Sequence, residues 1–174
     1  MLKKELEKIV GGLSKPSKMP GPAYNLPAYK CITGQKLAQV PGSVCHGCYA
    51  LKGRYRFNNV KSAMERRLEA LKHPGWVDAM IQLIKPHKEF RWHDSGDLQS
   101  LDHLKNIFRV CKGTPETKHW LPTREAQILK RVKVKARRPS GPGLQQLLRM
   151  ANTAARRQSR ATNAKIVDNA GTVI

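Results

Sequence analysis

Apolar residues recur every three or four positions in four segments of the chain, and this spacing predicts four helices. The first is expected to begin at Asn58 or Asn59, because asparagine is favoured as an N-cap, and to end before Pro74. Ser100 is expected to cap the third helix, which Gly113 closes. The predicted helices cover the segments from 58 or 59 to 71, 76–84, 101–112 and 126–132.

Two short segments have the pattern of strands. Glu89–His93 alternates between polar and apolar residues and runs into the turn-forming Asp94–Asp97, and Lys118–Leu121 is a second short strand. Strands that alternate with helices predict an α/β fold, here a partial parallel barrel-like sheet with helices outside. The C-terminal ends of parallel strands gather functional groups, so the polar loops 93–97 and 123–125 are expected to flank a site.

The chain before these elements has a different character. Residues 11–30 are rich in proline and glycine, which predicts an extended lead-in. Residues 31–53 hold three of the four cysteines among glycines and prolines, as expected for a loop that bends tightly around a metal. We therefore divide the chain into a lead-in (1–19), a cysteine-motif α/β domain (20–132) and a basic tail (133–174).

Lysine and arginine outnumber the acidic residues by 33 to 12, which gives a net charge of +21. Such a chain attracts polyanions, most commonly nucleic acid, through contacts that weaken with salt. The tail 133–174 is strongly basic but has no aromatic residue on which a base could stack. Its alternatives are a nucleic-acid contact, a solvated disordered tail, or an aberrant ending produced by a frameshift in the coding sequence.

No stretch of the sequence has the roughly 18 apolar residues that a transmembrane helix needs. The first ten residues mix charged and isolated apolar side chains, so they do not resemble a signal peptide or a membrane anchor. We expect a cytoplasmic protein, in the host cell if it is encoded by a phage. In that reducing compartment cysteines serve metal binding or catalysis rather than disulfides.

The pair Cys45-His-Gly-Cys48 can grip one metal ion or two irons of one cluster, and Cys31 can be brought alongside. A structural zinc needs a fourth ligand, for which His46 and Cys111 are available. Cys111 falls on the apolar face of its predicted helix and is expected in the core. Three thiolates suit a [4Fe–4S] cluster with one open iron, and the alternatives are zinc or no metal.

Several motifs resemble the cysteine-motif phage and prophage proteins known as gene product 88-like. They are Gly21-Pro-Ala-Tyr-Asn-Leu-Pro-Ala28, Cys31, Pro41-Gly-Ser-Val-Cys-His-Gly-Cys-Tyr-Ala50, Gly53-Arg-Tyr-Arg-Phe57, Arg91-Trp-His-Asp-Ser-Gly-Asp-Leu98 and Leu121-Pro-Thr-Arg124. The resemblance covers about residues 20–132 and implies a phage-type protein with no settled activity.

The same motifs are distantly similar to radical S-adenosylmethionine enzymes, although thirteen residues instead of three separate the first two cysteines. This similarity implies a cluster on three cysteines, with S-adenosylmethionine bound to the open iron. Ser95, Gly96 and Asp97 would then stand where those enzymes bind the amino group of S-adenosylmethionine, with Asp97 as the acceptor.

The polar residues after the strands have further interpretations. His93, Asp94 and Asp97 could face a substrate, or hold a hard divalent metal for nucleic-acid hydrolysis. The alternative is a turn in which Asp97 or Ser100 caps the following helix. Arg124 is expected to contact an anionic group, and its alternative is a surface ion pair with Glu125.

Three functions remain open from the sequence. The first is a phage-type iron–sulfur protein, and such a protein could be an S-adenosylmethionine-using enzyme that acts on nucleic acid or a host macromolecule. The second is a zinc-stabilised nucleic-acid-binding protein without catalysis. The third is a truncated, inactive remnant whose barrel does not close.

Overall fold

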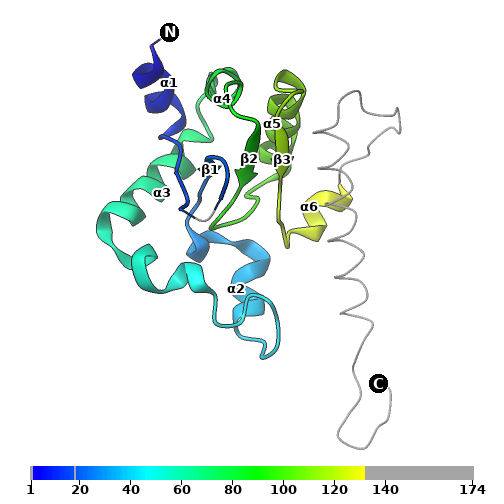
Figure 1. The fold of residues 1–174 in the computed structure, drawn as a ribbon. Helices are drawn as coiled ribbons and strands as arrows, with labels where there is room; N and C mark the ends of the chain where they lie inside the picture. Colours follow the sequence, from blue (N-terminus) through cyan, green and yellow to red (C-terminus); the bar gives the residue numbers. More distant parts are fainter. Residues whose placement is uncertain (1, 18, 132–174) are drawn as a thin grey trace, which may run out of the picture.

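The computed structural model describes residues 2–17 and 19–131, and Figure 1 shows their arrangement. A three-stranded sheet with the order β1-β2-β3 stands at the centre, and both neighbouring pairs are parallel. The strands are β1 (Ala23–Tyr24), β2 (Glu89–Trp92) and β3 (Lys118–Trp120). The predicted α/β class is therefore confirmed at the level of a small parallel sheet.

Six helices accompany this sheet in the described part of the chain. They are α1 (Lys3–Val10), α2 (Ile32–Ala38), α3 (Asn58–Ala70), α4 (Trp76–Ile84), α5 (Leu101–Gly113) and α6 (Ala126–Lys130). Three short 3₁₀ segments occupy Ala28–Lys30, Tyr49–Leu51 and Gly53–Arg56. None of the helices among the described residues is long and apolar enough to cross a membrane.

The strands alternate between two environments. Phe90 and Trp92 of β2 and His119 of β3 are buried, whereas Arg91 and Trp120 lie on the other face. Helix α4 is apolar around most of its circumference because it packs between α1 and α5. The core of the described chain therefore lies where these helices meet the buried face of the sheet.

The local patterns located α4, α5, β2 and β3 correctly. Ser100 caps α5 as predicted, since its Oγ accepts a hydrogen bond from the His103 amide at 3.0 Å. The prediction that Asn58 or Asn59 caps α3 was wrong. Phe57 is the N-cap, and the Asn59 side chain instead accepts from the neighbouring Val60 amide.

Three elements in the N-terminal part were not predicted. Helix α1 lies in the segment expected to be a lead-in, β1 in the proline-rich stretch, and α2 in the cysteine loop. The barrel-like closure is not observed, because residues 2–17 and 19–131 contribute only three strands. The basic tail, including the proposed frameshifted ending, lies outside the described residues.

The hydroxyl of Tyr24 joins β1 to three helices. It lies 2.7 Å from the carbonyl oxygen of Val10 and 2.9 Å from that of Arg67, and it accepts a hydrogen bond from Trp76 Nε1 at 3.0 Å. Burial raises the pKa of this phenol, so it stays protonated and can donate.

We expect Tyr24→Phe to lower the free energy of unfolding by about 1–3 kcal/mol, because buried polar groups on three helices lose their partner. Urea unfolding followed by circular dichroism measures this change. The control is Tyr29→Phe, since the Tyr29 hydroxyl bonds Glu65 at the surface. Equal losses in the two variants would contradict the structural role of Tyr24.

Candidate functional site

A cavity of about 530 Å³ opens at the C-terminal ends of β2 and β3. Its lining includes most of the residues singled out from the sequence. They are Cys31, Cys45, Cys48, His93, Asp94, Ser95, Gly96, Asp97 and Arg124. Chain segments that are far apart in sequence therefore meet at the strand ends, where a parallel sheet leaves room for a ligand.

The cysteines approach the cavity from two segments. Cys31 is the N-cap of α2, while Cys45 and Cys48 lie in the turns that follow this helix. A Cβ atom placed on Gly34 would lie 3.6 Å from the sulfur of Cys31 and 3.8 Å from that of Cys45. It would also lie only 2.9 Å from the Cβ atom of Cys31, so a larger residue at this position would collide with Cys31. Gly47, inside the pair, has a φ of 67°, which agrees with the predicted reversal of the chain.

The thiols differ in their electrostatic surroundings. Burial raises the pKa of Cys31 to about 12, and the negative charges of Asp97 and Glu125 raise it further. Burial also raises the pKa of Cys45, but the nearby guanidinium of Arg124 opposes this effect. A positive charge thus stands beside the sulfur atoms on one side of the cavity.

Glu125 attaches the Cys31 segment to the end of β3. Its Oε1 accepts hydrogen bonds from the amides of Ile32 at 3.1 Å and Thr33 at 2.8 Å. Its Oε2 accepts from the Thr33 hydroxyl at 2.6 Å, and the side chain is only 2% exposed. This buried carboxylate therefore caps α2 from more than 90 residues away along the chain.

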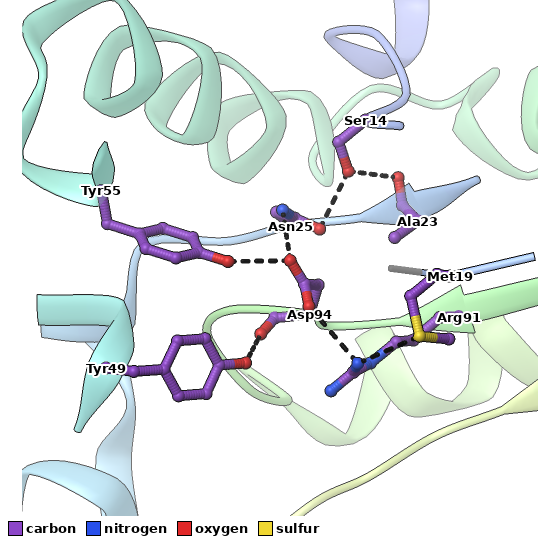
Figure 2. Close-up of polar contacts among 8 residues, drawn as sticks. All are labelled: Ser14, Met19, Ala23, Asn25, Tyr49, Tyr55, Arg91 and Asp94. Carbon is purple, nitrogen blue, oxygen red and sulfur yellow. Dashed lines mark hydrogen bonds and ion pairs between the residues drawn. The ribbon is translucent and has the colours of Figure 1, made fainter. Parts of the chain in front are cut away.

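Asp94 holds the segment that follows Cys48, as Figure 2 shows. Its carboxylate accepts a hydrogen bond from the Tyr55 hydroxyl at 2.8 Å and pairs with Arg91 at 3.3 Å. Its backbone carbonyl accepts a hydrogen bond from the Tyr49 hydroxyl, and Asn25 donates to Oδ2 from the end of β1. Asp94 therefore serves as an acceptor for protein groups from three directions.

Asp97 connects the loops that follow β2 and β3. Its Oδ1 accepts from the Leu98 amide at 2.7 Å and the Thr123 hydroxyl at 2.5 Å, and its Oδ2 accepts from the Arg124 amide at 2.7 Å. Burial raises its pKa to about 6, although these three donors favour the ionised form. The turn interpretation thus holds in modified form, because Asp97 fixes two loops while Ser100 caps α5.

Arg124 does not form the ion pair with Glu125 that was the alternative to an anion-binding role. Within the described part of the chain, the ion pairs are Lys72–Glu69, Arg91–Asp94 and Lys105–Asp102. The Glu125 carboxylate is used by α2, while the Arg124 side chain lines the cavity. The guanidinium therefore stays available to an anionic ligand.

His93 adopts a strained backbone at the end of β2, with a φ of 61°. Its Nδ1 lies 3.3 Å from the Tyr24 carbonyl oxygen, and its buried Nε2 has no partner among the described residues. The ring of His103 lies 5.2 Å away, and its Nε2 is also without a partner there. Burial lowers the pKa of His93 to about 4, so a neutral imidazole lies beside the cavity at neutral pH.

The two further candidates for a metal ligand lie elsewhere. Cys111 is 2% exposed in the core, as expected from its helix face. His46 is exposed, and its Nδ1 lies 3.1 Å from the Ala38 carbonyl oxygen. Within residues 2–17 and 19–131, no three His, Cys, Asp or Glu side chains form a group that could hold a metal ion.

One known protein family has a sequence model that matches the part of the chain that forms this cavity. The model of the family described as gene product 88 matches residues 2–141 of the chain. The chain belongs to the gene product 88 family. No curated protein and no solved structure matches it.

Membership in this phage gene-product family agrees with the resemblance found in the motifs. The match includes every residue of the cavity described above. The more distant similarity to radical S-adenosylmethionine enzymes is supported by none of the comparisons and stays a prediction.

The residues whose hydrogen bonds hold the cysteine segments in place were not predicted from the sequence. Glu125 was considered only as a partner of Arg124, whereas it caps α2. Tyr49 and Tyr55 were parts of motifs without an assigned role, and both contact Asp94. The only sequence signal was their position directly after the cysteine pair, and this position does not specify a distant acceptor.

We expect Glu125→Gln to raise the alkylation rate of Cys31 roughly tenfold in reduced, metal-free protein. The substitution removes a negative charge that raises the Cys31 pKa, and it weakens the contact that holds α2. Mass spectrometry of iodoacetamide-labelled peptides measures the rate. Glu116→Gln, at an exposed position, is the matched control. An unchanged Cys31 rate in a folded Glu125→Gln protein would contradict this account.

Because its pKa is lowered in the folded protein, His93 should reduce the free energy of unfolding as the pH falls. Its pKa is about 4 in the folded protein and 6.5 in the unfolded chain, so the unfolded state binds the proton first as the pH falls. Between pH 7 and pH 4.5 wild type should lose about 2–3 kcal/mol more stability than His93→Asn. Asparagine is the replacement because it tolerates the positive φ of this position. The raised pKa of Asp97 stabilises the folded protein as the pH falls, but Asp97 is present in both proteins and its effect cancels in the comparison. Urea unfolding at the two pH values provides the test, and equal losses would refute it.

Proposed function

We propose that this gene product 88 protein is an iron–sulfur protein in which Cys31, Cys45 and Cys48 hold a [4Fe–4S] cluster. The observation that supports this most directly is the presence of three cysteines from two segments on one cavity at the strand ends. Neither of the two fourth ligands considered for a zinc site lines this cavity, because Cys111 lies in the core and His46 is at the surface. Three thiolates leave one iron of such a cluster open to another ligand.

The number of cysteines supports the proposed cluster, because a structural zinc takes four protein ligands whereas three thiolates can hold a [4Fe–4S] cluster with one open iron. In a cluster each thiolate binds a different iron, so the sulfur atoms stand further apart than around one zinc. Gly34 keeps the chain close to the sulfur atoms of Cys31 and Cys45, where a larger side chain would displace Cys31.

Loading must remove protons from the cysteines. Cys31 has a pKa of about 12 and is therefore a thiol at neutral pH, so iron has to displace its proton. Thiolates that replace thiols add negative charge near Asp97 and Glu125. The guanidinium of Arg124, close to Cys45, offsets part of that charge.

A cluster held by these cysteines would offer one open coordination position for a ligand, and would allow one-electron reduction of that ligand with the electron supplied by an external donor. S-adenosylmethionine is the ligand that we propose, in keeping with the order of the motifs. Arg124 would pair with its carboxylate, and Asp97 would accept a hydrogen bond from its amino group. A carboxylate has about four acceptor positions, and Asp97 uses three of them for protein donors.

Asp94 and His93 would act on the bound ligand less directly. Asp94 positions the segment that carries Cys48 through Tyr49 and Tyr55, so we assign it a positioning role. His93 supplies a neutral imidazole beside the cavity, which can accept a proton at Nε2. The hydrolytic metal site considered for His93, Asp94 and Asp97 has less support, because the Asp94 and Asp97 oxygens already bond protein groups.

We expect full-length protein reconstituted with iron and sulfide under anaerobic conditions to bind about four irons per chain and to absorb near roughly 400 nm. Substituting Ser for Cys31, Cys45 or Cys48 should abolish this absorption and reduce the iron content. Cys111→Ala is the matched control and should load normally, because Cys111 packs in the core. Metal analysis and the absorption spectrum are the measurements.

A colourless protein that binds one zinc, with His46 or Cys111 protected from alkylation, would contradict the cluster and favour a zinc-stabilised protein. If the cluster forms, S-adenosylmethionine should change the electron paramagnetic resonance spectrum of the dithionite-reduced cluster in wild type and have a weaker effect in Arg124→Gln. An unchanged spectrum in wild type would reject S-adenosylmethionine as the ligand while leaving the cluster in place.

A further inference from the structure

The face of the sheet opposite the core carries polar and aromatic side chains. Parallel pairing sets Glu89 beside Lys118 and Arg91 beside Trp120, and the pleat directs these residues away from Phe90 and His119. A hollow of about 340 Å³ lies along this face. Its lining consists of Met19, Pro20, Gly21, Glu89, Phe90, Arg91, Lys118, His119 and Trp120.

This hollow adjoins the cysteine cavity. Arg91 lines both of them, and its guanidinium carbon lies 4.3 Å from the centre of the Trp120 ring. The ion pair with Asp94 fixes the guanidinium in this position. Arg91 therefore packs against the indole at the point where the hollow and the cavity share a side chain.

Trp120 is the accessible tryptophan of the protein. Its side chain is 36% exposed, whereas Trp76 is 1% and Trp92 0% exposed. A planar ligand that stacks on this partly exposed indole would remove apolar ring surface from water, which favours binding. No packing role in the core accounts for it.

Basic side chains outnumber acidic ones around the indole, because the hollow is lined by Arg91 and Lys118 against Glu89. Lys118 is exposed on the same face, and Arg124 lies in the adjoining cavity. The ion pairs of the described residues include neither of these side chains. Residues 1–131 hold 24 Lys and Arg against 11 Asp and Glu, so the domain is strongly basic even without the tail.

We infer that this sheet face binds single-stranded nucleic acid, with a base stacked against Trp120 and a phosphate held by Lys118. An aromatic ring flanked by cations suits such strands, because stacking tolerates any base and the cations follow the backbone. An acidic peptide would use the cations but leave the indole without a stacking partner. The binding does not require the cysteines to hold iron.

The test is a titration of the full-length protein with a single-stranded oligothymidine while tryptophan fluorescence is followed. We expect the oligonucleotide to quench the emission, since Trp120 is the tryptophan that a base can reach. Affinity measured independently by fluorescence anisotropy of a labelled oligonucleotide should fall roughly tenfold in Trp120→Leu. In Trp120→Phe most of the affinity should persist, because a phenyl ring can still stack.

Lys118→Gln should reduce the slope of log affinity against log salt by about one, as expected for one lost phosphate contact. Lys112→Gln, an exposed lysine at the end of α5, is the matched control and should leave the slope unchanged. Circular dichroism of each variant confirms that it is folded.

Binding without quenching, with equal affinity in Trp120→Leu, would place the contact elsewhere in the chain and overturn the inference. Absence of binding at low salt would also overturn the inference. So would displacement of the oligonucleotide by polyglutamate, if Trp120→Leu weakened the binding of polyglutamate as much as that of the oligonucleotide. Iron content is measured separately on the same preparations. Failure of nucleic-acid binding is therefore distinguishable from failure of the cluster.

Discussion

The buried carboxylate of Glu125 is the contact on which the architecture of the site depends. It satisfies two backbone amides and a hydroxyl at the start of α2, and these groups would otherwise lack partners inside the protein. In exchange, the carboxylate leaves water, which is unfavourable unless its oxygens are fully bonded. The arrangement joins the end of β3 to the segment that begins at Cys31. It adds a direct attachment to β3 for the first cysteine, whose segment is otherwise joined to the sheet through β1 and the Leu26–Ser95 hydrogen bonds.

Two further carboxylates act in the same way at the neighbouring strand end. Asp94 bonds the tyrosines after Cys48, and Asp97 bonds the loop after β3. The chain has only 12 acidic residues, and three of them are used within this region as acceptors for protein donors. In a protein this basic, buried acids also lower the local positive potential at the cavity. They leave Arg124 as a cation directed at whatever the cavity binds.

The sequence was informative where structure depends on neighbouring residues. Helices α4 and α5 and strands β2 and β3 follow from periodicity and caps, and the cavity residues were identified because they end the strands. Helix α2 was missed because it buries no side chain and its start is stabilised by Glu125, which is distant in sequence. Strand β1 has two residues, too few for a periodic signal. The barrel-like sheet was predicted from two strands and from a resemblance to other proteins. The described residues contain only three strands, and these do not close into a barrel.

The way in which Glu125 and Asp94 hold the cysteine segments has a thermodynamic consequence. In many small metalloproteins the metal organises the chain, so folding and loading are a single event and the apoprotein is unfolded. Here protein hydrogen bonds already restrict both segments, and a hydrophobic core exists independently of them. The loss of conformational entropy is therefore incurred when the chain folds rather than when a metal arrives. If the proposed cluster binds here, the domain can exist as a stable empty acceptor, and its degree of loading then reports supply of the cluster rather than the state of the fold.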